Sequence, residues 1–196
     1  MRKVCCVVML SLFVNAAYAQ HVAVVNGKAI SNKEFMWFFK RNHAGNANAT
    51  YSELETCLNL YIDFKLKVLD AREAGMDRDT SYLREIENYE AALRAQKRIS
   101  KTSAEYSFIM NEYKEAVLMF NISEKKIWER AQNDEHQLRN FYDQHRSAYG
   151  TMSFEEARGQ VIADYQRKME EDWVTALRKR FPIKRYQDEL KKLAKL

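Results

Sequence analysis

The sequence predicts a mainly α-helical fold. Proline occurs once and glycine five times in 196 residues, so few positions interrupt a regular helix. Charged residues make up 30% of the chain, and basic residues alternate with acidic ones, as is typical of solvated helix faces. Near the C-terminus, apolar side chains recur every fourth residue at Val161, Tyr165, Met169 and Trp173, which is the spacing of one helical face.

Residues 1–19 have the pattern of a secretory signal peptide. Two basic residues precede an apolar run over 4–14, and Ala17-Tyr18-Ala19 matches the small-residue cleavage pattern. The apolar run is too short to span a bilayer as a helix. We therefore expect export, cleavage after Ala19 and no stable insertion into a membrane.

A short β-hairpin is expected before the first helix. In "VAVVNGKAIS", two apolar runs flank Asn26-Gly27, a pair that favours a type I′ turn because both residues tolerate positive φ. Ser31 and Glu34 then have the spacing of a capping box that begins a helix. Five consecutive apolar residues, Phe35–Phe39, cover more than half of that helix's circumference, so it must bury more than one face.

Capping residues predict where the next helices begin. Thr50 and Glu53 form a second capping box, and Gly75 ends the helix that follows. Further helices are expected over 79–99 and 104–120. Ser123 and Asp134 are then interpreted as N-caps of two shorter helices.

The last part of the chain is predicted to hold one long helix and a tail. Ser153 and Glu156 form a third capping box, and Pro182 ends the helix that they begin. The tail is expected to contain a strand near Ile183 that pairs with the N-terminal hairpin, followed by a final helix.

Catalytic and metal-binding patterns are not found. The four histidines lack the spacing of a metal site, and the sequence has no nucleophile elbow, phosphate loop or dinucleotide fingerprint, so we expect no catalytic residue, no metal and no cofactor. The net charge of +5 is dispersed, which argues against a nucleic-acid partner. Cys57 lies among apolar residues and is interpreted as a buried small hydrophobe, with a reactive or dimer-linking thiol as the alternative.

Aromatic residues make up 12% of the chain, which is high for a helical protein. They can fill a core between long helices, or they can line a groove that holds unfolded segments of other proteins. Under the second interpretation the candidate client-binding residues are Met36, Trp37, Phe39, Phe64 and Trp173.

Several stretches, in this order, resemble the SurA-type family of periplasmic chaperones and parvulin-type peptidyl-prolyl isomerases, in particular its members from Bacteroidetes. The stretches are "VAVVNGKAISNKEF", "YIDFKLKVLDAREAGMDRD", "SYLREIENYEAALRAQKRI", "NEYKEAVLMFNISEKKIWERAQNDEHQLRNFYDQHRSAY" and "SFEEARGQVIADYQRKMEEDWVTALRKRFPIK". The resemblance implies a helical chaperone module with a short N-terminal hairpin. It also implies a periplasmic location and unfolded or outer-membrane proteins as clients.

The chain departs from this family at two places. Parvulin domains of full-length members would fall near Ile99–Ser103 and Tyr149–Met152, where five and four residues stand instead. We therefore expect an ATP-independent holdase that is not an enzyme. The alternative is a non-catalytic subunit that assembles or swaps helices with a full-length SurA-like relative or with itself; an active isomerase is the third possibility.

The expected organisation has four parts. Residues 1–19 form the signal peptide, 20–100 the N-terminal chaperone helices with their hairpin, and 101–149 a middle helical segment. Residues 150–196 contribute the long helix and tail that complete the chaperone module.

Overall fold

The computed structural model describes residues 20–43, 49–97 and 100–194, so the expected signal peptide lies outside the described part. Within it, no helix is both long and apolar enough to cross a membrane. The elements in chain order are β1 (His21–Val25), β2 (Lys28–Ser31), α1 (Asn32–Asn42), α2 (Tyr51–Glu73), η1 (Met76–Arg78), α3 (Thr80–Lys97), α4 (Ala104–Ser123), η2 (Glu124–Trp128), α5 (Glu129–Asn133), α6 (Glu135–Gln144), η3 (Arg146–Tyr149), α7 (Phe154–Arg180), β3 (Ile183–Arg185) and α8 (Gln187–Leu193). The predicted mainly helical fold is confirmed.

A three-stranded antiparallel sheet joins the beginning and the end of the described chain. The hairpin turn is the predicted one, because Asn26 and Gly27 both have positive φ, at 47° and 77°. Strand β3 pairs with β1, which confirms the predicted pairing of the tail with the hairpin. The strand order is β2-β1-β3, so β2 lies at an edge of the sheet.

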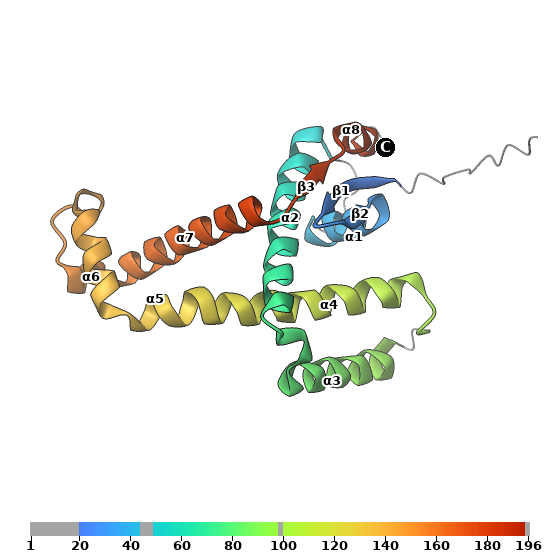
Figure 1. The fold of residues 1–196 in the computed structure, drawn as a ribbon, viewed down its shortest axis with the longest axis horizontal. Helices are drawn as coiled ribbons and strands as arrows, with labels where there is room; N and C mark the ends of the chain where they lie inside the picture. Colours follow the sequence, from blue (N-terminus) through green and yellow to red (C-terminus); the bar gives the residue numbers. More distant parts are fainter. Residues whose placement is uncertain (1–19, 44–48, 98–99, 195–196) are drawn as a thin grey trace, which may run out of the picture.

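Helix α2 is the central element of the fold. It packs against α1 and α8 near the sheet, against α4 further along, and against α7. Figure 1 shows α7 and the α4–α5 helix extending from α2 to form a long arm that ends at α6. Three apolar clusters follow this layout: one beneath the sheet, one among α2, α3 and α4, and one at the tip between α6 and α7.

Two predicted caps differ from the structure. Ser123 is not an N-cap, because it is buried within a continuous helix and its hydroxyl donates to the sulfur of Met119 at 3.6 Å. The helix continues there through the π-helical turn η2, which keeps Ile127 buried. The capping box at Ser31 is only half formed: its side chain accepts from the backbone N–H of Glu34, but the Glu34 carboxylate is held elsewhere by Tyr61 and Lys65.

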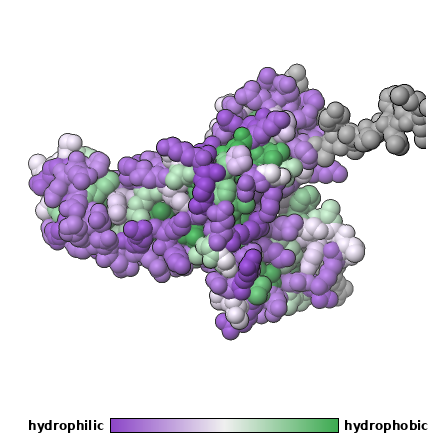
Figure 2. Space-filling view, in the orientation of Figure 1, coloured by the Kyte–Doolittle hydropathy of each residue, from purple (hydrophilic) through white to green (hydrophobic). Residues whose placement is uncertain are grey.

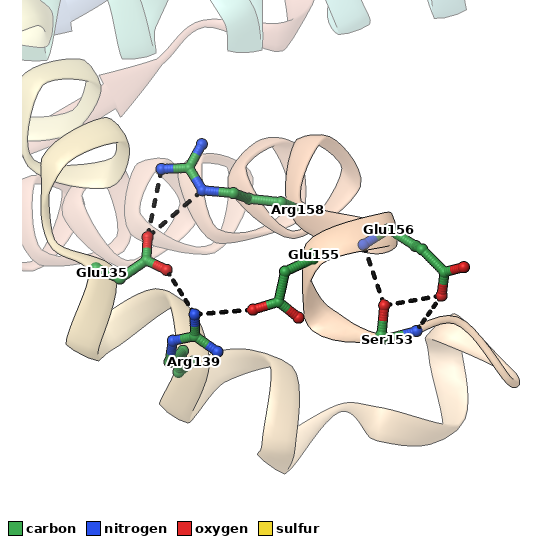
Figure 3. A network of polar contacts seen from close by, with 6 residues as sticks. All are labelled: Glu135, Arg139, Ser153, Glu155, Glu156 and Arg158. Atoms are coloured by element: carbon green, nitrogen blue, oxygen red, sulfur yellow. Dashed lines mark hydrogen bonds and ion pairs between the residues drawn. The ribbon is translucent and has the colours of Figure 1, made fainter.

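The connection before α7 is a well-packed corner at the tip of the arm. Gly150 adopts φ 61° and ψ −125°, and the predicted Ser153–Glu156 capping box is complete. Figure 3 shows this box beside a chain of ion pairs between α6 and α7, in which Arg139 links Glu135 to Glu155. Tight local geometry and exposed charges therefore hold this connection without further secondary structure.

Candidate functional site

A groove of about 610 Å3 lies between the hairpin, α1, α2 and α4. In Figure 2, apolar side chains gather beside the indentation between the part that bears the sheet and the part that bears α4. The residues that line it are Val25, Lys28, Ala29, Ile30, Ser31, Glu34, Trp37, Phe38, Asn42, Tyr61, Phe64, Lys65, Leu69, Arg72, Phe108, Asn111, Glu112, Glu115, Ala116 and Met119. The lining combines an aromatic wall, a set of ion pairs and one sheet edge.

The aromatic wall comes from three helices. Trp37 of α1 stacks on Phe108 of α4, with ring centroids 5.4 Å apart. On the α2 side, Tyr61 stacks between Phe38 and Phe64, at centroid distances of 4.3 and 5.8 Å. Tyr61 is buried, whereas Trp37, Phe38, Phe64 and Phe108 stay partly exposed and present faces and edges to an occupant.

The ion pairs of the groove centre on Lys65 of α2. Its ammonium nitrogen lies 2.7 Å from a Glu34 oxygen and 2.5 Å from a Glu115 oxygen. Arg72 lies 3.3 Å from the other oxygen of Glu115, and the Tyr61 hydroxyl donates to Glu34 at 2.8 Å. Burial, together with the nearby charge of Glu34, raises the pKa of Tyr61, so this phenol stays protonated and remains a hydrogen-bond donor.

A further carboxylate is paired at the rim. Glu112 of α4 accepts from Arg41 at 2.6 Å and from the indole N–H of Trp37 at 3.4 Å. Each of the three carboxylates that line the groove thus has a cation of this chain beside it. A cationic ligand would have to displace one of these partners, so the groove disfavours an occupant with basic groups.

Trp37 and Phe64 are the sequence-predicted site residues that the structure places in the groove. Met36 and Phe39 point elsewhere: Met36 packs against the cluster beneath the sheet, and Phe39 is 1% exposed within it. Phe39 therefore cannot contact a client in this conformation. The reason is helical geometry, since Phe39 lies one turn after the buried Phe35, on the same face, whereas Trp37 lies on another face.

Trp173 belongs to a second polar cluster, not to the groove. Its indole N–H donates to Asp70 at 2.9 Å, and the same carboxylate accepts from Lys126 at 2.5 Å and from Arg180 at 2.8 Å. Burial alone would raise the pKa of Asp70, but the three hydrogen bonds outweigh it and hold this pKa below its ordinary value. This cluster joins α2, η2 and α7, and we interpret it as a structural joint.

Sequence reasoning missed the ion pairs and Phe108. The paired residues are distant in sequence, so the local alternation of charges predicts only solvated helix faces. One local signal existed: Lys65 lies on the apolar stripe of α2, between Tyr61 and Leu69, and a lysine at such a position needs a buried counter-ion.

The described residues do not suggest a nucleophile or metal centre. Cys57 is buried beneath the sheet, and burial raises the pKa of its thiol to about 11, which agrees with its interpretation as a small core residue. Among residues that the structure describes, no group of three or more histidine, cysteine, aspartate and glutamate side chains is arranged to hold a metal ion. The groove lining includes neither histidine nor cysteine.

Comparisons of the chain with family models, with curated proteins and with solved structures found no match. The functional proposal therefore rests on the geometry of the groove, with its aromatic wall and internally paired carboxylates.

Proposed function

We propose that this protein is an exported, ATP-independent holdase of the SurA type that binds unfolded or nascent outer-membrane proteins in the periplasm, without prolyl isomerase activity. The observation that carries the proposal is the groove between the hairpin, α1, α2 and α4. Its aromatic wall offers apolar contact, while its carboxylates are neutralised within the chain.

Such a groove suits ligands that share composition rather than a fixed shape. Unfolded segments expose apolar side chains in many arrangements, and partly exposed aromatic rings contact them without requiring one geometry. The pairing of Trp37 with Phe108 and of Phe38 with Tyr61 gives two aromatic pairs in the groove lining. An apolar segment lying between them would contact both α1 and α2.

The resemblance of the chain to SurA-type chaperones points the same way. In that family a hairpin leads into chaperone helices, and here the hairpin, α1 and α2 build most of the groove. The lining offers tyrosine and lysine but no histidine or cysteine, so its chemistry favours binding over covalent catalysis.

The test is suppression of aggregation of an urea-unfolded β-barrel protein by the purified chain from residue 20 onward. We expect suppression at severalfold molar excess, and a marked loss when Trp37 and Phe108 are both replaced by alanine. Phe120→Ala is the matched control, because Phe120 is an aromatic residue on the same helix α4, 51% exposed and outside the groove. Absence of suppression by the unmodified chain would contradict the proposal.

A proline-peptide assay tests the isomerase part separately. We expect the chain not to accelerate cis–trans isomerisation, which takes on the order of tens to hundreds of seconds without a catalyst. Detectable turnover would overturn this part and leave the holdase proposal standing.

One observation keeps a second function open, that of a helical subunit with a fixed partner. Phe120 and Trp128 pack edge to face at 4.9 Å on the arm, outside the groove, and Phe120 is largely exposed. An exposed aromatic pair is typical of interaction surfaces. Sedimentation of the chain alone and with a full-length SurA-like relative distinguishes the two: a stable stoichiometric complex or dimer favours the subunit.

A further inference from the structure

The groove has a feature that its aromatic wall does not explain, namely the free edge of β2. In the hairpin, Val25 is opposite Lys28 across the two-residue turn, and Val24 is opposite Ala29. In a two-residue hairpin the pair next to the turn exchanges hydrogen bonds, and the following pair does not. The backbone N–H and C=O of Ala29 therefore point away from β1.

That edge opens onto the groove. Strand β2 is the outer strand of the sheet, and its four residues, Lys28–Ser31, all line the groove. No other described element donates a backbone hydrogen bond to Ala29 or accepts one from it. Unpaired strand edges readily accept another chain, and this one is covered by neither a helix nor a loop of the described chain.

We propose that a client segment binds in extended form and adds to β2 as a fourth strand of the sheet. This inference rests on the proposed holdase function and names its ligand: an uncharged extended segment with apolar side chains at alternate positions. Backbone pairing to Ala29 sets the register, and every second side chain lies over the aromatic wall formed by Phe38, Tyr61 and Phe64.

Charge balance selects this occupant. Lys65, Arg72 and Arg41 already neutralise the carboxylates of the groove, so a basic side chain on the inward face would lack a partner. Strands of membrane β-barrels alternate apolar and polar residues and carry an uncharged outward band, which matches both requirements. A helical peptide offers no free backbone groups to β2, and a basic peptide finds no unpaired carboxylate in the groove lining.

Backbone methylation of a peptide tests the inference directly. A labelled nine-residue peptide with alternating valine and threonine is titrated against the full mature chain, alongside two versions N-methylated at alternate residues. In an added strand only every second N–H faces β2. Methylation of the N–H groups that face β2 should weaken binding about tenfold, since one net hydrogen bond corresponds to roughly that factor. Methylation of the other N–H groups should change the affinity about twofold or less. Equal effects of the two sets would overturn the inference.

Variants of Ala29 test the same edge from the protein side. Ala29→Pro removes the outward N–H and leaves the ladder bonds to β1, because proline is tolerated where an edge-strand N–H faces outward. Ala29→Val is the matched control, since it keeps the N–H and favours a strand. We expect the proline variant to bind the peptide about tenfold more weakly and the valine variant to bind it like the original chain; equal affinities would count against strand addition.

These outcomes separate the inference from the proposed function. If the chain suppresses aggregation but both methylated peptides bind alike, the holdase proposal stands and strand addition is wrong. If the chain neither suppresses aggregation nor binds the unmethylated peptide, the proposed function itself is wrong. Should Ala29→Pro fail to fold, as judged by circular dichroism, the methylated pair decides the question.

Discussion

Replacing Asp70 with asparagine should weaken the joint between α2, η2 and α7. The Asp70 side chain is buried and accepts hydrogen bonds from Lys126, Arg180 and Trp173. Asparagine has nearly the same shape but no charge, so the substitution removes two charge-assisted interactions while it leaves an acceptor for Trp173. The substitution therefore tests the charge of Asp70 separately from the packing of its side chain.

The magnitude follows from the exposure of the partners. Removing one member of a buried ion pair costs about 3–5 kcal/mol when the other charge is left without solvent. Here the side chains of Lys126 and Arg180 are 41% and 47% exposed, so both can regain water. We therefore expect a smaller loss of unfolding free energy, about 2–3 kcal/mol, a substantial part of the roughly 5–15 kcal/mol typical of a domain.

Urea unfolding measured by circular dichroism checks this value, with Asp172→Asn as the control. Asp172 pairs with Lys168 on the exposed face of α7, so its replacement should cost about 0.5 kcal/mol or less. The pH dependence gives a second check. Because the folded-state pKa of Asp70 lies below its unfolded value, its stabilisation is complete above the unfolded pKa of about 3.9 and declines as pH falls through the folded-state pKa. Equal stability of Asp70→Asn and the original chain at pH 7, or a difference that stays constant to pH 2, would refute the reasoning.

Three further predictions concern single residues. Gly150→Ala should lower the unfolding free energy by about 1–3 kcal/mol, because Gly150 has a positive φ that alanine adopts only with strain. Gly159→Ala should raise the unfolding free energy by about 0.5–1 kcal/mol, because Gly159 lies within helix α7. Chemical denaturation measures both changes, and equal effects would contradict the positive φ of Gly150. Cys57 should react with a thiol reagent at pH 8 far more slowly in the native chain than in urea, since its pKa is raised to about 11 by burial; equal rates would show that the thiol is accessible. Lys65→Met should destabilise the chain by about 2–4 kcal/mol in thermal or urea unfolding, because it leaves Glu34 and Glu115 without their shared cation; a neutral effect would mean that solvent already screens them.

Local chemistry made much of the fold predictable. Asn26-Gly27 specifies its turn because few residue pairs accept two positive φ values, and Thr50 with Glu53 specifies a helix start through bonds within four residues. Ser123 shows where such reasoning ends. Its sequence context resembles that of a cap, but the helix continues past it through a π-helical turn in which Ile127 is buried.

The groove depended on information that a single sequence does not display. Trp37 and Phe39 are equally apolar neighbours, and only the docking of α1 onto α2 decides which of them is buried. Lys65 and Glu115 are likewise far apart in sequence, and nothing local indicates that α2 and α4 bring them within 2.5 Å. Residue types predicted an aromatic groove, whereas its membership required the tertiary structure.

The joint and the groove are mechanically connected through α4. Glu115 in the groove and Lys126 at the joint lie on one uninterrupted helix, since η2 and α5 continue α4 without a break. Loosening the Asp70 contact therefore frees that helix to shift against α2, which alters the spacing between the groove walls. We expect Asp70→Asn to weaken binding of the nine-residue valine–threonine peptide under native conditions, although Asp70 does not line the groove.

Gly150→Ala is the matched control for this coupling, because it perturbs the tip of the arm and leaves the joint unchanged. Peptide affinity should stay the same in that variant at a temperature where both variants remain folded. If Asp70→Asn also leaves the affinity unchanged, then the ion pair between Lys65 and Glu115 keeps α2 and α4 in place at the groove even when the joint is weakened. A loss of affinity in Asp70→Asn alone would instead show that a buried carboxylate outside the groove influences binding in it.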